Sequence, residues 1–574
     1  MPRSLTALLA LAVLGLAGGA TPAGAALVAP ELPALLAAGP QPVWVFFADK
    51  GVPANDLAVL RAAEARLSDR CLARRARAGV PGAAWIDLPN APAYLEALHA
   101  EGLTIRAESR WLAAVSVAVD QSSLIRLAAL PWVVRLEPVR ASAPRAPWLD
   151  PAPSARSHAT AIGREDPLDY GGSLTELAQL QVPPVHLRGF HGEGVVVGML
   201  DSGFNTTHEA LAGLTVLGAW DFINDDPIVA NEPGDPEGQQ NHGTMTLSTL
   251  AGYKPGALIG PAFGASFYLA KTEDASQEVP VEEDYWVEGI EWLEAQGCDI
   301  VSSSLAYDDW YSFADFDGNT CVTTIAADQA VALGVAVFNS AGNYRLTTGT
   351  IAAPADGDSV IAAGAVDAAG LIASFSSPGP TADGRIKPDL CAMGVANHVV
   401  KPGTLNEYRS ASGTSFSCPL AAGVGALLLG AHPGTSPMRL RQALRSTASQ
   451  ADSPDNDYGW GIIDALAALD YLDALTPASA ATPAFTLAGA WPNPFNPATR
   501  IGFTLDRELD LRLDIHDLQG RRVRTLVAAV LPAGAHTANW DGRDGAGRPL
   551  ASGVYLARLA AGGEQRTLKL LLLE

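Results

Sequence analysis

The chain has 574 residues, of which 48% are hydrophobic, 17% charged and 7% aromatic. At roughly 150 residues per domain, this length predicts three or four folded units and excludes a globally disordered chain or a coiled coil. Lysine and arginine number 38 against 61 aspartate and glutamate residues, which gives a formal net charge of −23. Because so acidic a chain repels phosphate backbones, we expect no nucleic acid among its partners.

The first 25 residues predict export. Arg3 precedes an apolar run from Leu5 to Ala17, and small residues then lead to Ala25. This pattern is typical of a secretory signal peptide cleaved before Ala26, and the apolar run is too short to span a bilayer. We therefore predict a bacterial protein that is secreted or held at the cell surface.

Residues 26–150 predict a small α+β domain followed by a linker. Residues 42–47 form an apolar run typical of a buried strand, and residues 56–78 form one amphipathic helical pattern. Two further strands and an intervening helix are predicted at residues 111–120, 132–136 and 121–130. Between residues 61 and 145 there are 12 arginines against 8 acidic residues, so this block is basic. The prolines that follow predict an exposed, extended linker.

Residues 151–475 alternate buried strands with helices. The strands are predicted at residues 194–200, 299–302, 335–338 and 360–363, and the helices at residues 287–296, 323–333 and 415–429. Such a pattern predicts an α/β domain whose parallel sheet is covered by helices on both faces. Its functional site should lie at the carboxyl ends of the strands.

The last part of the chain changes character after a linker at residues 476–484. Residues 485–574 contain short alternating strands separated by turn dipeptides such as Asn-Pro, Asp-Gly and Ser-Gly. This predicts a small antiparallel β-sandwich.

Five cysteines are scattered without paired spacing: Cys71, Cys298, Cys321, Cys391 and Cys418. Neither a disulfide framework nor a zinc site is therefore indicated. A single bridge between Cys298 and Cys321 is the one pairing left open.

Three residues in the central block could carry chemistry. Asp201 ends a predicted strand in Leu-Asp-Ser-Gly, His242 lies in Asn-His-Gly-Thr, and Ser415 lies in Gly-Thr-Ser before an apolar helix. A nucleophilic serine needs a base that takes its proton, and that base needs a buried carboxylate to orient it. Ser415 also begins a helix, where free N–H groups favour an oxyanion.

The order Asp, His, Ser at spacings of 41 and 173 residues resembles the subtilisin-like serine proteases, or subtilases. That resemblance implies a subtilisin-like fold and a secreted serine endopeptidase. Ser415 would attack the peptide carbonyl, His242 would act as base and then acid, and Asp201 would orient His242. Asn343, in Ser-Ala-Gly-Asn, would donate the second hydrogen bond to the oxyanion.

The resemblance also implies how substrate binds. Ser304, Leu305 and Ala306 match the edge strand that pairs with the substrate backbone, and Ala353 and Pro354 match the opposite wall of the primary pocket. Ala306 stands where subtilases usually have glycine, which implies a narrower pocket.

The flanking blocks resemble accessory domains. The basic N-terminal block is similar to the subtilase propeptide that chaperones and inhibits the protease, which implies a zymogen cleaved in the linker near residues 140–156. The C-terminal block is similar to secretion and sorting domains of the type IX kind and to the immunoglobulin-like module of the flagellar hook cap. The implied partners are protein or peptide substrates, the chain's own propeptide and an outer-membrane secretion system, with the protease itself a monomer.

No cofactor is required for this chemistry, but a structural calcium ion is a candidate. Asp315, Asp317 and Asn319 resemble part of a calcium loop, although its closing glutamate is missing. Residues 221–317 hold 20 acidic residues against two basic ones, Lys254 and Lys271. This acidic rim would suit a basic propeptide, basic peptide substrates or calcium.

Two other classes of protein share some of these features. A surface-binding or adhesive protein could keep a protease fold without turnover, and the intact triad and oxyanion residues argue against it. A lipase-type α/β-hydrolase is disfavoured because Ser415 lacks the Gly-x-Ser-x-Gly setting and the order of the triad differs.

Overall fold

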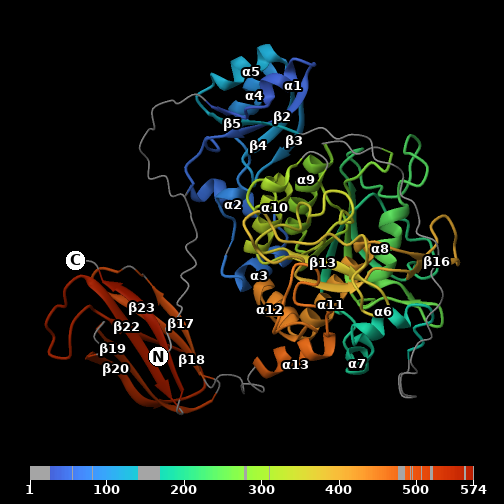
Figure 1. Ribbon diagram of the computed structural model, residues 1–574. Coiled ribbons are helices and arrows are strands. Elements are labelled where there is room, and N and C mark those ends of the chain that lie inside the picture. Colours follow the sequence, from blue (N-terminus) through green and yellow to red (C-terminus); the bar gives the residue numbers. More distant parts are fainter. Residues whose placement is uncertain are drawn as a thin grey trace. The chain divides into compact units, whose positions relative to one another are not determined.

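The computed structural model describes residues 26–54, 56–80, 82–139, 168–276, 281–308, 311–475, 485–491, 493, 495–505, 507–517, 521–561 and 564–572. The chain forms two compact units, residues 1–472 and 473–574 (Figure 1). The predicted signal peptide, the linker with its self-cleavage region at residues 140–156, and the linker at residues 476–484 lie outside the described residues.

The first unit is built around a seven-stranded sheet in the order β14-β13-β12-β11-β6-β10-β7, in which every neighbouring pair is parallel. The strands are β6 (Val196–Asp201), β7 (Thr215–Asp221), β10 (Ser266–Lys271), β11 (Ile300–Ser303), β12 (Ala336–Ser340), β13 (Ile361–Val366) and β14 (Leu390–Met393). Every residue of β6 is buried, as expected for a strand covered on both faces. The predicted α/β fold is confirmed.

Alternate residues of β6 contact different helical layers. Val197 and Met199 belong to a core formed with α8 (Asn241–Ala251) and α11 (Thr414–Ala431). Val196 and Leu200 face the opposite core, formed with α9 (Val281–Gln296) and α10 (Val322–Ala332). The first layer is completed by α6 (Leu174–Gln179), α7 (Val182–Leu187), α12 (Pro437–Thr447) and α13 (Ala465–Leu475).

Helix α11 is the central buried helix of the fold. In the part of the chain that the structure describes, it is the one helix long and apolar enough to cross a membrane, and 89% of that stretch is buried inside the protein. It was predicted as a buried helix and it packs on the sheet as one. Two small antiparallel pairs lie beside the main sheet: β8 (Tyr253–Lys254) with β9 (Leu258–Ile259), and β15 (Asn397–Val400) with β16 (Tyr408–Ala411).

The N-terminal domain, residues 26–139, has a five-stranded sheet in the order β1-β5-β2-β4-β3. Its elements are β1 (Leu27–Val28), α1 (Leu32–Leu36), β2 (Gln41–Phe47), α4 (Pro92–Ala100), β3 (Ile105–Ser109), β4 (Ala114–Val119), α5 (Gln121–Ala128) and β5 (Val133–Pro138). Helices α4 and α5 pack on one face of this sheet. Trp44 on the other face and Trp111 in the turn between β3 and β4 join a core with Trp286 and Ile290 of α9, so this domain belongs to the same compact unit as the central sheet.

The single helix predicted over residues 56–78 is wrong. The structure has two helices there, α2 (Leu57–Glu64) and α3 (Asp69–Arg77). Ser68 starts the second one, because its Oγ accepts a hydrogen bond from the N–H of Cys71 at 3.1 Å. The N–H of Ser68 also donates to the carbonyl of Ala295 at 3.0 Å, so a contact with the central domain fixes the break.

The pairing of Cys298 with Cys321 is also wrong, since all five cysteines are free and buried. Burial in apolar surroundings raises the pKa of the Cys418 thiol to about 12, so this residue stays a neutral thiol near the site.

The second unit is a β-sandwich, as predicted. Its antiparallel sheets have the orders β17-β18-β21 and β20-β19-β22-β23, and side chains from both sheets share one core. The strands are β17 (Phe485–Trp491), β18 (Thr499–Leu505), β19 (Leu509–His516), β20 (Arg522–Leu531), β21 (Gly534–Trp540), β22 (Gly553–Ala561) and β23 (Glu564–Leu572).

Candidate active site

Asp201 and His242 meet at the carboxyl end of the central sheet. Asp201 is the last residue of β6 and is fully buried, and His242 lies in the first turn of α8. Nδ1 of His242 is 2.7 Å from Oδ1 of Asp201. The next residue, Gly243, permits this approach, because a Cβ there would lie 2.2 Å from the carbonyl oxygen of Gly203.

Two more groups hold the Asp201 carboxylate in place. The N–H of Ser202 donates to Oδ1 at 2.8 Å, and the hydroxyl of Thr246 donates to Oδ2 at 2.9 Å. The carboxylate can only accept hydrogen bonds, so Nδ1 of His242 carries the proton and Nε2 is left as the base. Sequence reasoning missed Thr246, although it lies four residues after His242 and hence on the same face of the helix.

The electrostatics of His242 suit a base that becomes charged during reaction. Burial disfavours the charged ring, but the negative charge of Asp201 and its hydrogen bond outweigh that effect and raise the pKa of His242 above its ordinary value. The imidazolium form is therefore stabilised where it would be needed.

Ser415 is the second residue of α11. The ring of the following residue, Phe416, is 6.2 Å from the ring of His242. The hydroxyl of Ser415 donates to the carbonyl of Ser304 at 3.4 Å, and the hydroxyl of Ser304 donates back to the carbonyl of Ser415 at 2.8 Å. At the second helical position the N–H of Ser415 has no partner within the helix and can face an anion.

Asn343 is held in one orientation by Thr414. Its Oδ1 accepts hydrogen bonds from both the N–H and the hydroxyl of Thr414, each at 3.0 Å. The hydroxyl of Thr414 accepts in turn from the N–H of Gly342 at 3.2 Å. Because Oδ1 is fixed by donors, Nδ2 points away from Thr414 as a donor. The role of Thr414 was not foreseen from the sequence.

The two predicted walls of the substrate pocket lie side by side. The N–H of Tyr307 donates to the carbonyl of Ala353 at 2.9 Å, and the N–H of Ala353 donates to the carbonyl of Tyr307 at 3.2 Å. This pairing brings the segment containing Ser304, Leu305 and Ala306 next to the segment of Ala353 and Pro354. The hydroxyl of Tyr344 donates to the carbonyl of Ala306 at 3.2 Å.

The side chains of the calcium candidates form hydrogen bonds within their own loop. Oδ2 of Asp315 accepts from the N–H and the hydroxyl of Ser312, both at 2.8 Å. Oδ1 of Asp317 accepts from the N–H of Asn319 at 2.8 Å. These local bonds account for the positions of Asp315 and Asp317 without a cation, and calcium binding there stays a prediction.

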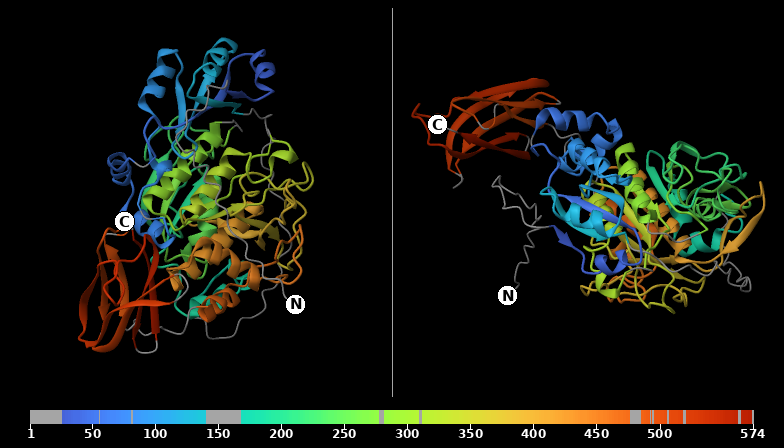
Figure 2. Two further views of the ribbon diagram at one scale, coloured as in Figure 1. Left: turned by 90° about the vertical axis from the view of Figure 1, so that its left-hand side faces the viewer. Right: turned by 90° about the horizontal axis from the view of Figure 1, so that it is seen from above.

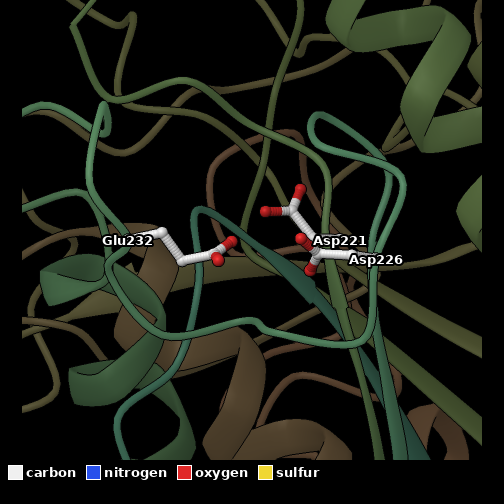
Figure 3. Close-up of side chains that lie close together, drawn as sticks. All are labelled: Asp221, Asp226 and Glu232. Carbon is white, nitrogen blue, oxygen red and sulfur yellow. The ribbon is translucent and has the colours of Figure 1, made fainter.

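A different acidic group was missed. Asp221, Asp226 and Glu232 each offer an oxygen atom, and these atoms lie within 4.8 Å of one another (Figure 3). The buried ammonium of Lys271 lies 2.7 Å from Oδ2 of Asp221 and 2.8 Å from Oδ2 of Asp235. It therefore supplies positive charge within the protein. The run of acidic residues after β7 was the available sequence signal.

Comparisons with known proteins agree with this geometry. Residues 192–461 match the model of the subtilase family, peptidase S8. Residues 42–149 match the peptidase S8 propeptide domain of Bacteroidota, and residues 493–564 match the FlgD Ig-like domain.

Several subtilisins are similar to the central part of the chain. Subtilisin from Bacillus pumilus is 31% identical over 295 residues, which are 51% of this chain and 97% of that protein. Subtilisin DY from Bacillus licheniformis is 32% identical over 292 residues, 50% of this chain and 96% of that protein. A solved protease from Pseudoalteromonas arctica matches 54% of this chain and 99% of its own, at 21% identity and a TM-score of 0.44. The chain belongs to the subtilase family of serine endopeptidases and carries that family's propeptide domain.

Proposed function

We propose that Asp201, His242 and Ser415 are the catalytic triad of this endopeptidase. The observation that carries the proposal is the 2.7 Å contact between Nδ1 of His242 and Oδ1 of Asp201, with His242 beside the residue that follows Ser415. A buried carboxylate paired with a histidine at the carboxyl end of the sheet, near a serine that begins a helix, supports this assignment.

The reaction follows from these positions. Oγ of Ser415 attacks the peptide carbonyl while Nε2 of His242 takes the hydroxyl proton. The resulting oxyanion would accept hydrogen bonds from Nδ2 of Asn343 and from the N–H of Ser415. His242 then returns the proton to the leaving amine, and water repeats the sequence on the acyl-enzyme.

The substrate would lie along the segment from Ser304 to Ala306. An extended peptide there could pair with the backbone as an added strand. Ala353 and Pro354 would form the facing wall of the primary pocket, and the extra methyl group of Ala306 would favour smaller side chains than glycine would admit.

We further propose that the protein is an exported zymogen. The signal-like residues 1–25 would direct secretion. The propeptide domain would inhibit the protease until the protease cuts its own linker near residues 140–156. The C-terminal sandwich would address the protein to an outer-membrane secretion system. Its family match and its separate compact fold support a role as an appended module.

Expression of a Ser415→Ala variant tests the triad and self-processing together. We expect it to accumulate as an unprocessed precursor without activity on a protein substrate. The matched control is Ser410→Ala, which removes an exposed hydroxyl on β16 and should mature as the wild type does. Normal maturation of Ser415→Ala without added protease would contradict self-cleavage.

A further inference from the structure

The propeptide domain reaches the catalytic domain in two separate places. One is its sheet, which packs on α9. The other is a helical insertion between β2 and α4, residues 49–90, which contains α2 and α3 and which we call the arm. Helix α3 lies away from the propeptide sheet and alongside the catalytic domain (Figures 1 and 2).

An arginine of the arm caps the carboxyl ends of two catalytic-domain helices. Nη1 of Arg74 donates to the carbonyls of Glu294 at 3.2 Å and Cys298 at 2.6 Å, at the end of α9. Its Nε donates to the carbonyl of Leu333 at 3.4 Å, at the end of α10. The last carbonyls of a helix lack intrahelical partners and carry partial negative charge, so a cation placed there stabilises both helix ends.

A buried carboxylate of the catalytic domain depends on the same segment. Glu294 on α9 is 1% exposed, and it forms ion pairs with Arg74 and Arg75, whose side chains are 3% and 0% exposed. Arg75 reaches both carboxylate oxygens, at 2.8 and 2.6 Å. A further arm residue, Asp87, holds Arg75 from the other side at 2.6 and 2.8 Å.

The surface under the arm is also fitted to it sterically. Gly297 follows α9 and Gly334 follows α10, with φ of +92° and +98°. A Cβ at Gly297 would lie 2.8 Å from Cβ of Arg70, and a Cβ at Gly334 would lie 2.9 Å from Cβ of Ala78. Glycine at both positions lets α3 lie directly on the ends of the two helices.

We propose that the arm is a second anchor that holds the cleaved propeptide on the protease. The arm binds near the end of α9, just before the amino end of β11. Asp201 lies at the carboxyl end of β6, and therefore at the opposite ends of the strands. The arm therefore retains the propeptide without itself entering the catalytic cleft. This inference rests on the proposed role of the propeptide as inhibitor, and it assigns the lifetime of the inhibited complex to Arg74, Arg75 and Glu294.

The test uses the full chain with Ser415→Ala and a site-specific protease sequence inserted within residues 140–167. After cleavage by the added protease, the rate of propeptide dissociation is measured by size-exclusion chromatography of diluted samples over time. Because this chain has no nucleophile, the readout is independent of catalysis. Failure of the triad proposal would appear elsewhere, as an active Ser415→Ala enzyme.

Glu294→Gln should speed dissociation by roughly tenfold or more, since it leaves the buried Arg74 without its counter-charge and Arg75 paired with Asp87 alone. The matched control is Glu407→Gln. That carboxylate pairs with Lys401 at 2.6 Å on the surface, and its loss should change the rate by no more than about twofold. An unchanged rate for Glu294→Gln would show that the sheet alone holds the propeptide and would overturn the proposal.

A second variant covers the case in which Glu294→Gln does not fold. Arg70 of the arm donates to the carbonyl of Gly297 at 3.1 Å and pairs with Asp299, while its side chain is 38% exposed. Arg70→Ala therefore leaves the ion pairs of the buried Arg74 and Arg75 intact. We expect the propeptide to dissociate roughly threefold faster or more. Its control is Arg126→Ala, an exposed pair with Glu101 within the propeptide. Equal rates for Arg70→Ala and Arg126→Ala would overturn the proposal.

Discussion

Thr414 donates two hydrogen bonds to Oδ1 of Asn343, one from its N–H and one from its hydroxyl, each at 3.0 Å. The residue before the proposed nucleophile, Ser415, thereby orients the asparagine amide as the proposed oxyanion donor requires. Thr414 and Asn343 are 71 residues apart in the sequence, so one hydrogen-bonded pair joins the segments of the proposed nucleophile and the proposed oxyanion donor.

Removing the Thr414 hydroxyl should loosen that arrangement. We expect Thr414→Val to lower kcat by roughly tenfold with little change in KM, and Asn343→Ala to lower it by about 10²–10³-fold. The measurement is steady-state hydrolysis of a peptide substrate. Thr323→Val on α10 is the matched control, since the buried Thr323 hydroxyl forms no hydrogen bond. A Thr414→Val enzyme as active as Thr323→Val would contradict the role given to Thr414.

The pH profile should report His242. Its neutral form is the base, and its pKa is raised by Asp201, so the acidic limb of kcat/KM should lie above pH ~6.5, the ordinary value for histidine. Asp201→Asn should lower kcat by roughly 10⁴-fold and move the remaining limb to lower pH. The exposed Asp470 provides a control, because Asp470→Asn should leave both unchanged. A limb that stays in place in Asp201→Asn would show that another group titrates.

Propeptide retention should weaken as pH rises. Burial raises the pKa of Asp284 and of Glu288 to about 7, and it raises the pKa of Glu291 as well. All three lie on α9 against the propeptide, where the N–H of Glu108 donates to Glu288 at 2.9 Å and the hydroxyl of Ser109 donates to Glu291 at 2.5 Å.

Once the propeptide leaves, these carboxyl groups should return to the ordinary range near pH ~4. The protonated forms of these three groups favour the complex, so their contribution to retention is full below about pH 4, is lost as the pH rises from about 4 to 7, and does not change above that. Dissociation of the cleaved Ser415→Ala chain should be faster at pH 7.5 than at pH 5, and Asp284→Asn should flatten the difference. Slower dissociation at the higher pH would contradict this sign.

Asp389 should matter for stability. It is fully buried between Lys387 at 2.9 Å and Arg441 and Arg445, each at 2.5 Å, and these cations hold its pKa far below the usual range. Asp389→Asn leaves the three cations facing a neutral amide, which should lower the free energy of unfolding by about 3–5 kcal/mol. Thermal unfolding in the Ser415→Ala background measures this loss.

The exposed residue Asp452 supplies the control for that measurement. Asp452→Asn should leave the unfolding temperature unchanged. An unchanged temperature for Asp389→Asn would contradict the structural role of the buried cluster.

The sequence predicted the features that depend on short segments of the chain. Apolar runs such as residues 335–338 predicted buried parallel strands, and Asp201, His242 and Ser415 each lie in a short motif at the end of an element. The structure pairs Asp201 with His242 and places Phe416, the residue after Ser415, beside the His242 ring. Asn343 also follows a strand, and its proposed role came from the resemblance of Ser-Ala-Gly-Asn to the subtilase motif.

What the sequence could not predict depends on contacts between distant segments. The hydrophobic pattern of residues 56–78 continues through the break at Ser68, where the cap on α3 is joined by a hydrogen bond to the distant Ala295. The pairing of Arg74 with Glu294 spans 220 residues. The acidic stretch suggested a basic partner in general terms, and the structure shows Glu288, Glu291 and Glu294 of that stretch in contact with the propeptide domain.

The most direct test of the central claim is labelling of the mature wild-type protein with a fluorophosphonate, followed by peptide mapping. A triad built on Ser415 predicts about one phosphonyl group per chain, located on Ser415, with loss of peptidase activity in step with labelling. An Asp201→Asn variant whose propeptide has been removed by an added protease should react with the fluorophosphonate far more slowly. A matured protein that hydrolyses peptides while Ser415 remains unlabelled would contradict the account.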